Sequence, residues 1–135
     1  MRKIDKIILH CSDSDIKAHD DIKVIREWHK ARNFSDVGYH YFIRKDGTIQ
    51  KGRNWEKIGA HCKGQNKASI GICLSGRHKF TTRQFEALEH TLERLTDAFG
   101  ELPVHGHYEF SEKTCPNFDV STFMGEYYDK IYGNY

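Results

Sequence analysis

Two short apolar runs constrain the fold of this chain most strongly. Residues 6–10 contain Ile7-Ile8-Leu9, and residues 69–74 read Ser-Ile-Gly-Ile-Cys-Leu. Both runs are shorter than an ordinary helix, and runs of this length and composition are typical of strands buried on both faces. A segment with helical periodicity follows each of these runs along the chain. The sequence therefore predicts an α/β fold with residues 69–74 as a central strand.

Three segments predict helices because apolar residues recur every three to four positions. The first follows Asp20 or Asp21, either of which can cap its first turn. The second opens with a capping box of Thr81 and Gln84 and ends at Gly100. The third follows a cap at Asp119. The residues expected to face the core are Ile22, Ile25 and Trp28 or His29, then Phe85, Leu88, Leu92, Leu95 and Phe99, then Phe123, Tyr127 and Ile131.

A hairpin and a further strand complete the predicted sheet. Residues 39–44 and 48–51 flank Lys45-Asp46-Gly47, and Asp-Gly between two such runs is a strong hairpin signal. Residues 102–107 predict another short strand. There is no linker, internal repeat or low-complexity segment. We therefore expect one domain over residues 1–135, with a mixed central sheet flanked by helices.

Composition excludes several classes of function. The chain is 30% charged and 38% hydrophobic, as an ordinary folded protein is. A net charge of +2 without a run of basic residues does not indicate a nucleic-acid binder. No apolar stretch approaches the roughly 20 residues that span a bilayer, and the N-terminal run is too short for a signal peptide. We expect a monomer made in the cytosol, with no nucleic-acid partner and no membrane insertion.

Histidine and cysteine residues near both ends of the chain predict a metal site. His10 ends the first strand, where functional side chains are often displayed. His105 and His107 are two residues apart on a predicted strand, so both imidazoles would share a face, and either or both could bind metal. Cys115 follows, with its backbone restricted by Pro116. Three nitrogen and sulfur ligands suit Zn²⁺, and a fourth position open to water is typical of a catalytic site.

The remaining cysteines and histidines give no comparable signal. Cys11, Cys62 and Cys73 form no C-x-x-C pair, and we expect them to be buried or half-buried thiols. The histidines at positions 19, 29, 78 and 90 lie on predicted helices or loops without partners, and the pattern assigns them no role.

An ordered set of short motifs covers nearly the whole chain. The motifs are residues 8–12, 28–30, 36–43, 46–48, 52–53, 59–64, 66, 69–74, 106–107 and 113–116. In this order they resemble the type 2 N-acetylmuramoyl-L-alanine amidases, a family that includes short phage lysozymes and animal peptidoglycan recognition proteins. Each motif alone is weak, whereas the ordered set is specific.

The resemblance implies a zinc site in a groove on one side of the mixed sheet. It assigns the zinc ligands to His10, His107 and Cys115. It selects His107 over His105 because the ligand histidine of the family lies eight residues before the cysteine of the Cys-Pro pair.

The resemblance also implies the reaction, which is hydrolysis of the amide bond between N-acetylmuramic acid and L-alanine in peptidoglycan. Lys113 matches the residue that stabilises the oxyanion of the tetrahedral intermediate. Tyr39 matches the active-site tyrosine, which donates a hydrogen bond at neutral pH because its ordinary pKa is near 10. Without the resemblance, the sequence favours a solvated surface lysine at Lys113. It leaves Tyr39 open between an active-site residue and a strand residue packed at the sheet edge. His61, Arg53 and Asn66 are expected to contact substrate, and His61 could instead orient a zinc ligand.

Two other functions share parts of this pattern. Some relatives bind peptidoglycan without cutting it, typically after loss of the cysteine ligand, whereas this chain keeps Cys115. Short phage relatives can also bind a phage RNA polymerase, which no residue here supports. We expect the protein to act on the cell wall after release through a membrane lesion, as phage endolysins do. A bacterial enzyme that recycles wall fragments has the same sequence profile.

Overall fold

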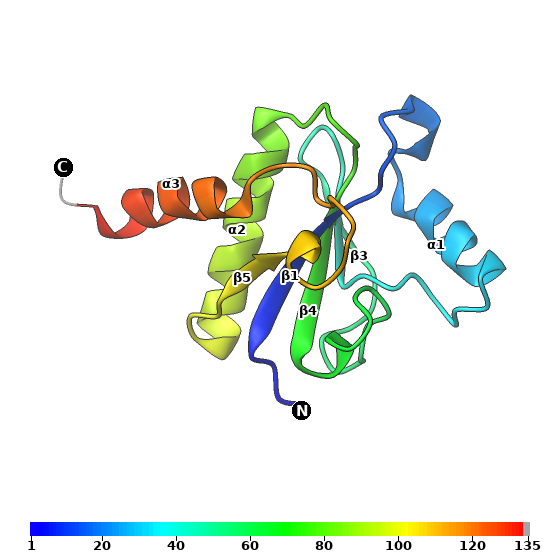
Figure 1. Ribbon diagram of the computed structural model, residues 1–135, viewed down its shortest axis with the longest axis horizontal. Coiled ribbons are helices and arrows are strands. Elements are labelled where there is room, and N and C mark those ends of the chain that lie inside the picture. The colour runs from blue at the N-terminus through cyan, green and yellow to red at the C-terminus, as the bar shows by residue number, and fades with distance from the viewer. Residues whose placement is uncertain (134–135) are drawn as a thin grey trace.

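The sheet is built around two parallel central strands, β1 and β4. The computed structural model describes residues 1–133, in which the strand order is β3-β2-β4-β1-β5 (Figure 1). Only β3 runs antiparallel to its neighbour. The strands are β1 (Lys6–Cys11), β2 (Tyr41–Ile43), β3 (Ile49–Lys51), β4 (Ser69–Leu74) and β5 (Val104–Gly106). The predicted α/β class, with a mixed central sheet, is confirmed.

The register between β1 and its neighbours brings the ends of the strands together. β1 pairs with β4 along its whole length, and every residue of β4 is buried, as a central strand requires. β5 pairs with β1 as far as Leu9 opposite Gly106. The residues that follow this last pair, His10 of β1 and His107, therefore lie side by side.

Helices cover both faces of the sheet. These are α1 (Ile22–Ala31), α2 (Thr82–Phe99) and α3 (Val120–Tyr132), with short 3-10 turns η1 (Lys17–His19), η2 (Asn66–Ala68) and η3 (His107–Glu109). α2 and α3 pack on the face that contains Ile7 and Leu9, whereas α1 packs on the face that contains Phe42 and Cys73. Because side chains alternate along a strand, His10 lies on the α1 face. In Figure 1, α1 lies on the opposite side of β1 and β4 from α2 and α3.

The helix ends follow the local signals in the sequence. Asp21, rather than Asp20, caps α1 by accepting the N–H of Lys23. Thr81 and Gln84 form the predicted capping box of α2, and Gly100 ends it with a φ of 80°. Asp119 caps α3 by accepting the N–H of Thr122.

Some predicted boundaries and orientations are wrong. The strand expected over residues 102–107 ends at Gly106, because His107 begins η3 and the Glu109 carboxylate accepts the N–H of Gly106. His105 and His107 therefore do not share one strand face. Ile131, expected in the core, is 44% exposed because α3 extends past the sheet (Figure 1). Of the two alternatives predicted for the core-facing residue at the end of α1, His29 is buried with Ile22 and Ile25, as the spacing allowed, and Trp28 is 38% exposed.

The remaining expectations concern the other cysteines, membrane-spanning helices and the bounds of the domain. Cys11, Cys62 and Cys73 are buried free thiols, as predicted. Within residues 1–133, none of the helices has the length and apolar character needed to cross a bilayer. Residues 134 and 135, which the predicted domain over residues 1–135 includes, lie outside the described residues.

Candidate metal centre

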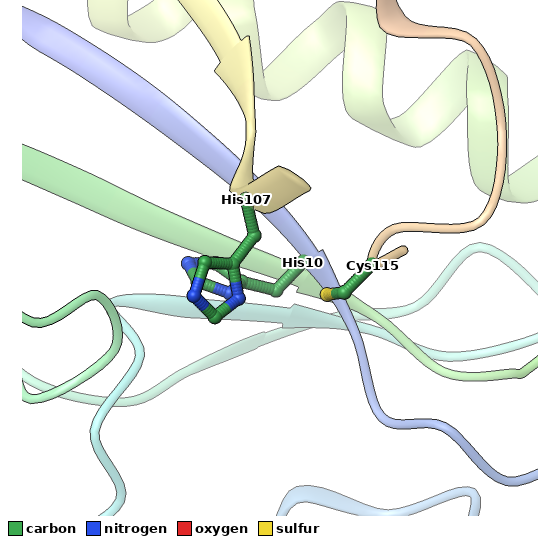
Figure 2. Close-up of side chains that lie close together, drawn as sticks. All are labelled: His10, His107 and Cys115. Atoms are coloured by element: carbon green, nitrogen blue, oxygen red, sulfur yellow. The ribbon is translucent and has the colours of Figure 1, made fainter. Parts of the chain in front are cut away.

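Three side chains from separate parts of the chain converge near the C-terminal end of β1. His10 belongs to β1, His107 opens η3, and Cys115 lies in the loop between η3 and α3. One candidate donor atom from each lies within 4.8 Å of the others, and Figure 2 shows the three side chains directed toward one another. The ring centroids of His10 and His107 are 4.6 Å apart. This is the only group of three such candidate metal ligands in the part of the chain that is described.

The loop that carries Cys115 is tied to the sheet by backbone hydrogen bonds. The N–H of Cys11, in the last position of β1, donates to Cys115 Sγ at 3.0 Å. The N–H of Tyr108 donates to the carbonyl oxygen of Cys115 at 2.9 Å, which closes the loop from η3. The sulfur is thus placed by β1 and by η3, the two elements that carry the histidines.

The protonation preferences of the three groups suit a soft divalent cation. Burial, followed by the neighbouring His61, holds the pKa of His10 well below its usual range. Burial also lowers the pKa of His107, with a smaller contribution from Lys113. Both imidazoles are therefore neutral, which is the form that binds metal. Contact with the Cys11 side chain and burial raise the pKa of the Cys115 thiol, and a bound cation would offset this by stabilising the thiolate. Two neutral imidazoles and one thiolate are a donor set that fits zinc.

The three side chains line a cavity of about 790 Å³ on the α1 side of the sheet. Its wall includes Tyr39, His61 and Lys113 together with residues of α1 and of the loop before η2. A cavity of this size, with a few convergent polar groups, is the usual form of a substrate site.

Comparison with known proteins identifies the family to which this architecture belongs. Residues 1–118 match the sequence profile of the N-acetylmuramoyl-L-alanine amidases. The chain belongs to the N-acetylmuramoyl-L-alanine amidase family. The endolysin of Enterobacteria phage K11 is 34% identical to this amidase, and the match covers 88% of this chain and 84% of the endolysin. The endolysin of Escherichia phage T7 is 36% identical, and the match covers 86% of this chain and 82% of that endolysin. The solved N-acetylmuramoyl-L-alanine amidase LysC from Clostridium intestinale superposes with a TM-score of 0.83 at 28% identity, covering 93% of this chain and 85% of LysC. The predicted enzyme class, an amidase, is confirmed.

The two predicted catalytic residues of the amidase both line the cavity. The ring centroid of Tyr39 lies 5.1 Å from that of His10, and burial raises the pKa of its hydroxyl well above the usual value. Tyr39 is therefore a hydrogen-bond donor and not a base. Lys113 is exposed at the mouth, and none of the ion pairs in residues 1–133 includes it. Its ammonium group is free to meet a developing negative charge.

The three residues predicted to contact substrate have different surroundings. Asn66 Oδ1 accepts the backbone N–H groups of His61 and Cys62, which holds the loop against η2. His61 is buried, and its Nδ1 lies 2.8 Å from His10 Nε2. Arg53 is not part of the cavity wall. Its guanidinium donates to the carbonyl oxygens of Val37 and Ile58, each at 2.8 Å, so it joins backbone segments of the structure. Substrate contact by these residues stays a prediction.

His29 lines the cavity although the sequence pattern assigned it no role. It lies on α1, and its Nδ1 accepts the N–H of Gly38 at 2.8 Å. Its ring centroid lies 5.4 Å from that of Tyr39. Burial, followed by the charges of Arg32 and Arg53, lowers its pKa to about 4, so the ring is neutral. The sequence signals at His29 were its core-facing position in the helical spacing and its place in the family motif at residues 28–30.

Proposed function

We propose that this amidase is a zinc enzyme of the endolysin type that cleaves the bond between N-acetylmuramic acid and L-alanine in peptidoglycan. The observation that carries the proposal is the convergence of His10, His107 and Cys115 in one cavity. The three are the only such group within residues 1–133, and their protonation preferences match zinc. Because all three ligands come from one chain, we expect a monomer to be active.

The side chains around the cavity would make different contributions to the reaction. His10, His107 and Cys115 would hold the zinc, which supplies Lewis-acid chemistry by activating a water and polarising the scissile carbonyl. Lys113 is exposed and lines the same cavity, and its positive charge would stabilise the tetrahedral oxyanion. Tyr39 donates a hydrogen bond from the cavity wall because its hydroxyl stays protonated. Asn66 holds the wall itself and lines the cavity, where it would also contact substrate, whereas Arg53 lies outside the wall.

The proposal also covers where the enzyme acts. The similarity to phage endolysins supports a role in lysis, with the protein reaching the wall after release from the cytosol. The alternative is a module that recognises peptidoglycan without cutting it. The complete ligand group and the presence of Tyr39 and Lys113 in the same cavity favour catalysis.

Digestion of purified sacculi tests this function. The wild type, Cys115→Ala and Lys113→Ala are compared, and zinc is quantified in each protein. The wild type should carry about one zinc per chain and release stem peptides with new L-alanine amino termini. Cys115→Ala should lose both properties. Lys113→Ala should keep its zinc and lose roughly 10²–10³ in turnover, as expected for the loss of one oxyanion donor.

The opposite result identifies the alternative function. If the wild type binds sacculi but produces no new amino termini, even with added zinc, the protein is a recognition module. If sacculi resist digestion while soluble muropeptides are cleaved, the enzyme recycles wall fragments and is not an endolysin.

A further inference from the structure

His61 is held rigidly against His10. Its backbone is fixed because Asn66 Oδ1 accepts the N–H groups of His61 and Cys62. Its ring lies directly over Gly71 of β4, where an added Cβ would come within 2.6 Å of the imidazole. The rings of His61 and His10 meet edge to face, with an angle of 89° between their planes and 4.9 Å between their centroids. His61 therefore has one available orientation, with Nδ1 toward His10 and Nε2 toward Ser69.

The hydrogen-bond directions around Ser69 follow from the number of protons available. Ser69 Oγ lies 2.7 Å from the carbonyl oxygen of Gln65 and 3.1 Å from His61 Nε2. A carbonyl oxygen can only accept, so the single hydroxyl proton of Ser69 points to Gln65. Ser69 Oγ must then accept from His61, which places a proton on Nε2 of that ring.

The proton on His61 Nε2 determines the state of His10. A neutral imidazole carries one proton, so His61 Nδ1 holds a lone pair and acts as an acceptor. Its neighbour at 2.8 Å, His10 Nε2, must be the donor. His10 Nδ1 is then the nitrogen with the free lone pair. Free imidazole samples both tautomers, whereas this arrangement permits one.

We propose that Gln65, Ser69 and His61 form a relay that locks His10 in the Nε2–H tautomer and presents its Nδ1 to the metal. His61 is then a positioning residue, not a substrate contact. The inference rests on the proposed zinc site. Because the partner of His10 is a neutral ring and not a carboxylate, it adds no negative charge to that of the Cys115 thiolate. Loss of such an outer hydrogen-bond partner typically lowers metal affinity about 10–100-fold.

Zinc affinity measured by competition with a chromophoric chelator tests the relay in the full-length protein. His61→Leu removes the acceptor and should weaken zinc binding about 10–100-fold. His61→Asn places an amide oxygen near the former Nδ1 and should restore most of the affinity. Ser69→Ala should fall between these two. His40→Asn is the matched control, because His40 is buried beside His61, with ring centroids 5.9 Å apart, and is not part of the relay. It should bind zinc like the wild type.

A second measurement needs no variant. Long-range ¹H–¹⁵N spectra of the metal-free wild type at neutral pH report which ring nitrogen carries the proton. The relay requires Nε2–H on both His10 and His61. A proton on Nδ1 of either ring overturns it, as does a wild-type zinc affinity in His61→Leu. If the wild type binds no zinc, the proposed function fails and the inference fails with it. If zinc binding is normal but insensitive to His61, only the inference fails.

Discussion

At the scale of single residues, the surroundings of each histidine determine its chemistry. His10, His29, His40 and His61 are all buried, and burial lowers the pKa of each one. The four neutral rings differ in the groups that they contact. His10 belongs to the ligand group, His61 contacts it, His29 receives the N–H of Gly38, and His40 connects β4 to the loop at Lys57.

His40 makes a measurable contribution to the pH dependence of stability. Its Nδ1 accepts the N–H of Gly71, its Nε2 donates to the carbonyl oxygen of Lys57, and burial lowers its pKa to about 4. In the unfolded chain the pKa returns to about 6.5, so between that pH and pH 4 the imidazole is protonated in the unfolded state but neutral in the folded state. The contribution of His40 to the free energy of unfolding is therefore fully present above pH 6.5 and is lost as the pH falls toward 4. His40 alone should lower the free energy of unfolding by about 2 kcal/mol between pH 7.5 and pH 5.

Urea unfolding of the metal-free protein at the two pH values measures this effect. In His40→Asn the difference in free energy between the two pH values should shrink by about the same amount. An unchanged difference would mean that His40 is not a group that titrates on unfolding.

At the scale of elements, the N-terminus of α2 joins the helix to the far ends of β2 and β4. Gln84 is fully buried, accepts the N–H of Thr81, and donates to the carbonyl oxygens of Ile43 and Ser75. Thr81 completes the capping box and also donates to the carbonyl oxygen of Lys45 in the hairpin. The capping box was predictable because its residues are three apart in the sequence. The contacts to the strands were not, because they join residues about 40 positions apart or depend on how the helix packs.

Thr81→Ala should lower the free energy of unfolding by about 1–2 kcal/mol, because the first turn of α2 loses its cap. Thr82→Ala is the matched control, since Thr82 is the exposed neighbour and does not cap the helix. Urea denaturation of both variants compares the two positions. Amidase activity on sacculi should be kept in both, because α2 packs on the opposite face of the sheet from the cavity. Equal destabilisation by the two substitutions would contradict the capping role.

At the scale of the whole molecule, the proposed metal connects the two ends of the fold. His10 comes from the first strand, and Cys115 lies beyond the last. A cation that binds only when both are in place binds the folded state and not the unfolded chain. Metal binding is therefore linked to folding.

Removal of the metal should destabilise the wild type. With free zinc at about 100 times its dissociation constant, metal binding should raise the free energy of unfolding by about 2.7 kcal/mol. Urea unfolding with zinc and with a chelator should differ by this amount in the wild type and should coincide in Cys115→Ala. Identical curves for the wild type with and without chelator would show that no metal binds selectively to the folded state.

The sequence by itself determined the elements and the family. Periodicity and caps predicted the three helices and the central strand at residues 69–74, because these signals depend on neighbours within a few positions. The ordered motifs named the amidase family and pointed to His10, His107 and Cys115. Tertiary structure alone decided which side chains meet. The pairing of Leu9 with Gly106 sets His107 beside His10, and η3 removes His105 from the same face. The backbone partners of Arg53 and Asn66, and the contact from His61 through Ser69 to Gln65, also appear only in three dimensions. Local sequence encodes burial and caps, whereas hydrogen bonds between remote residues depend on strand register and loop path.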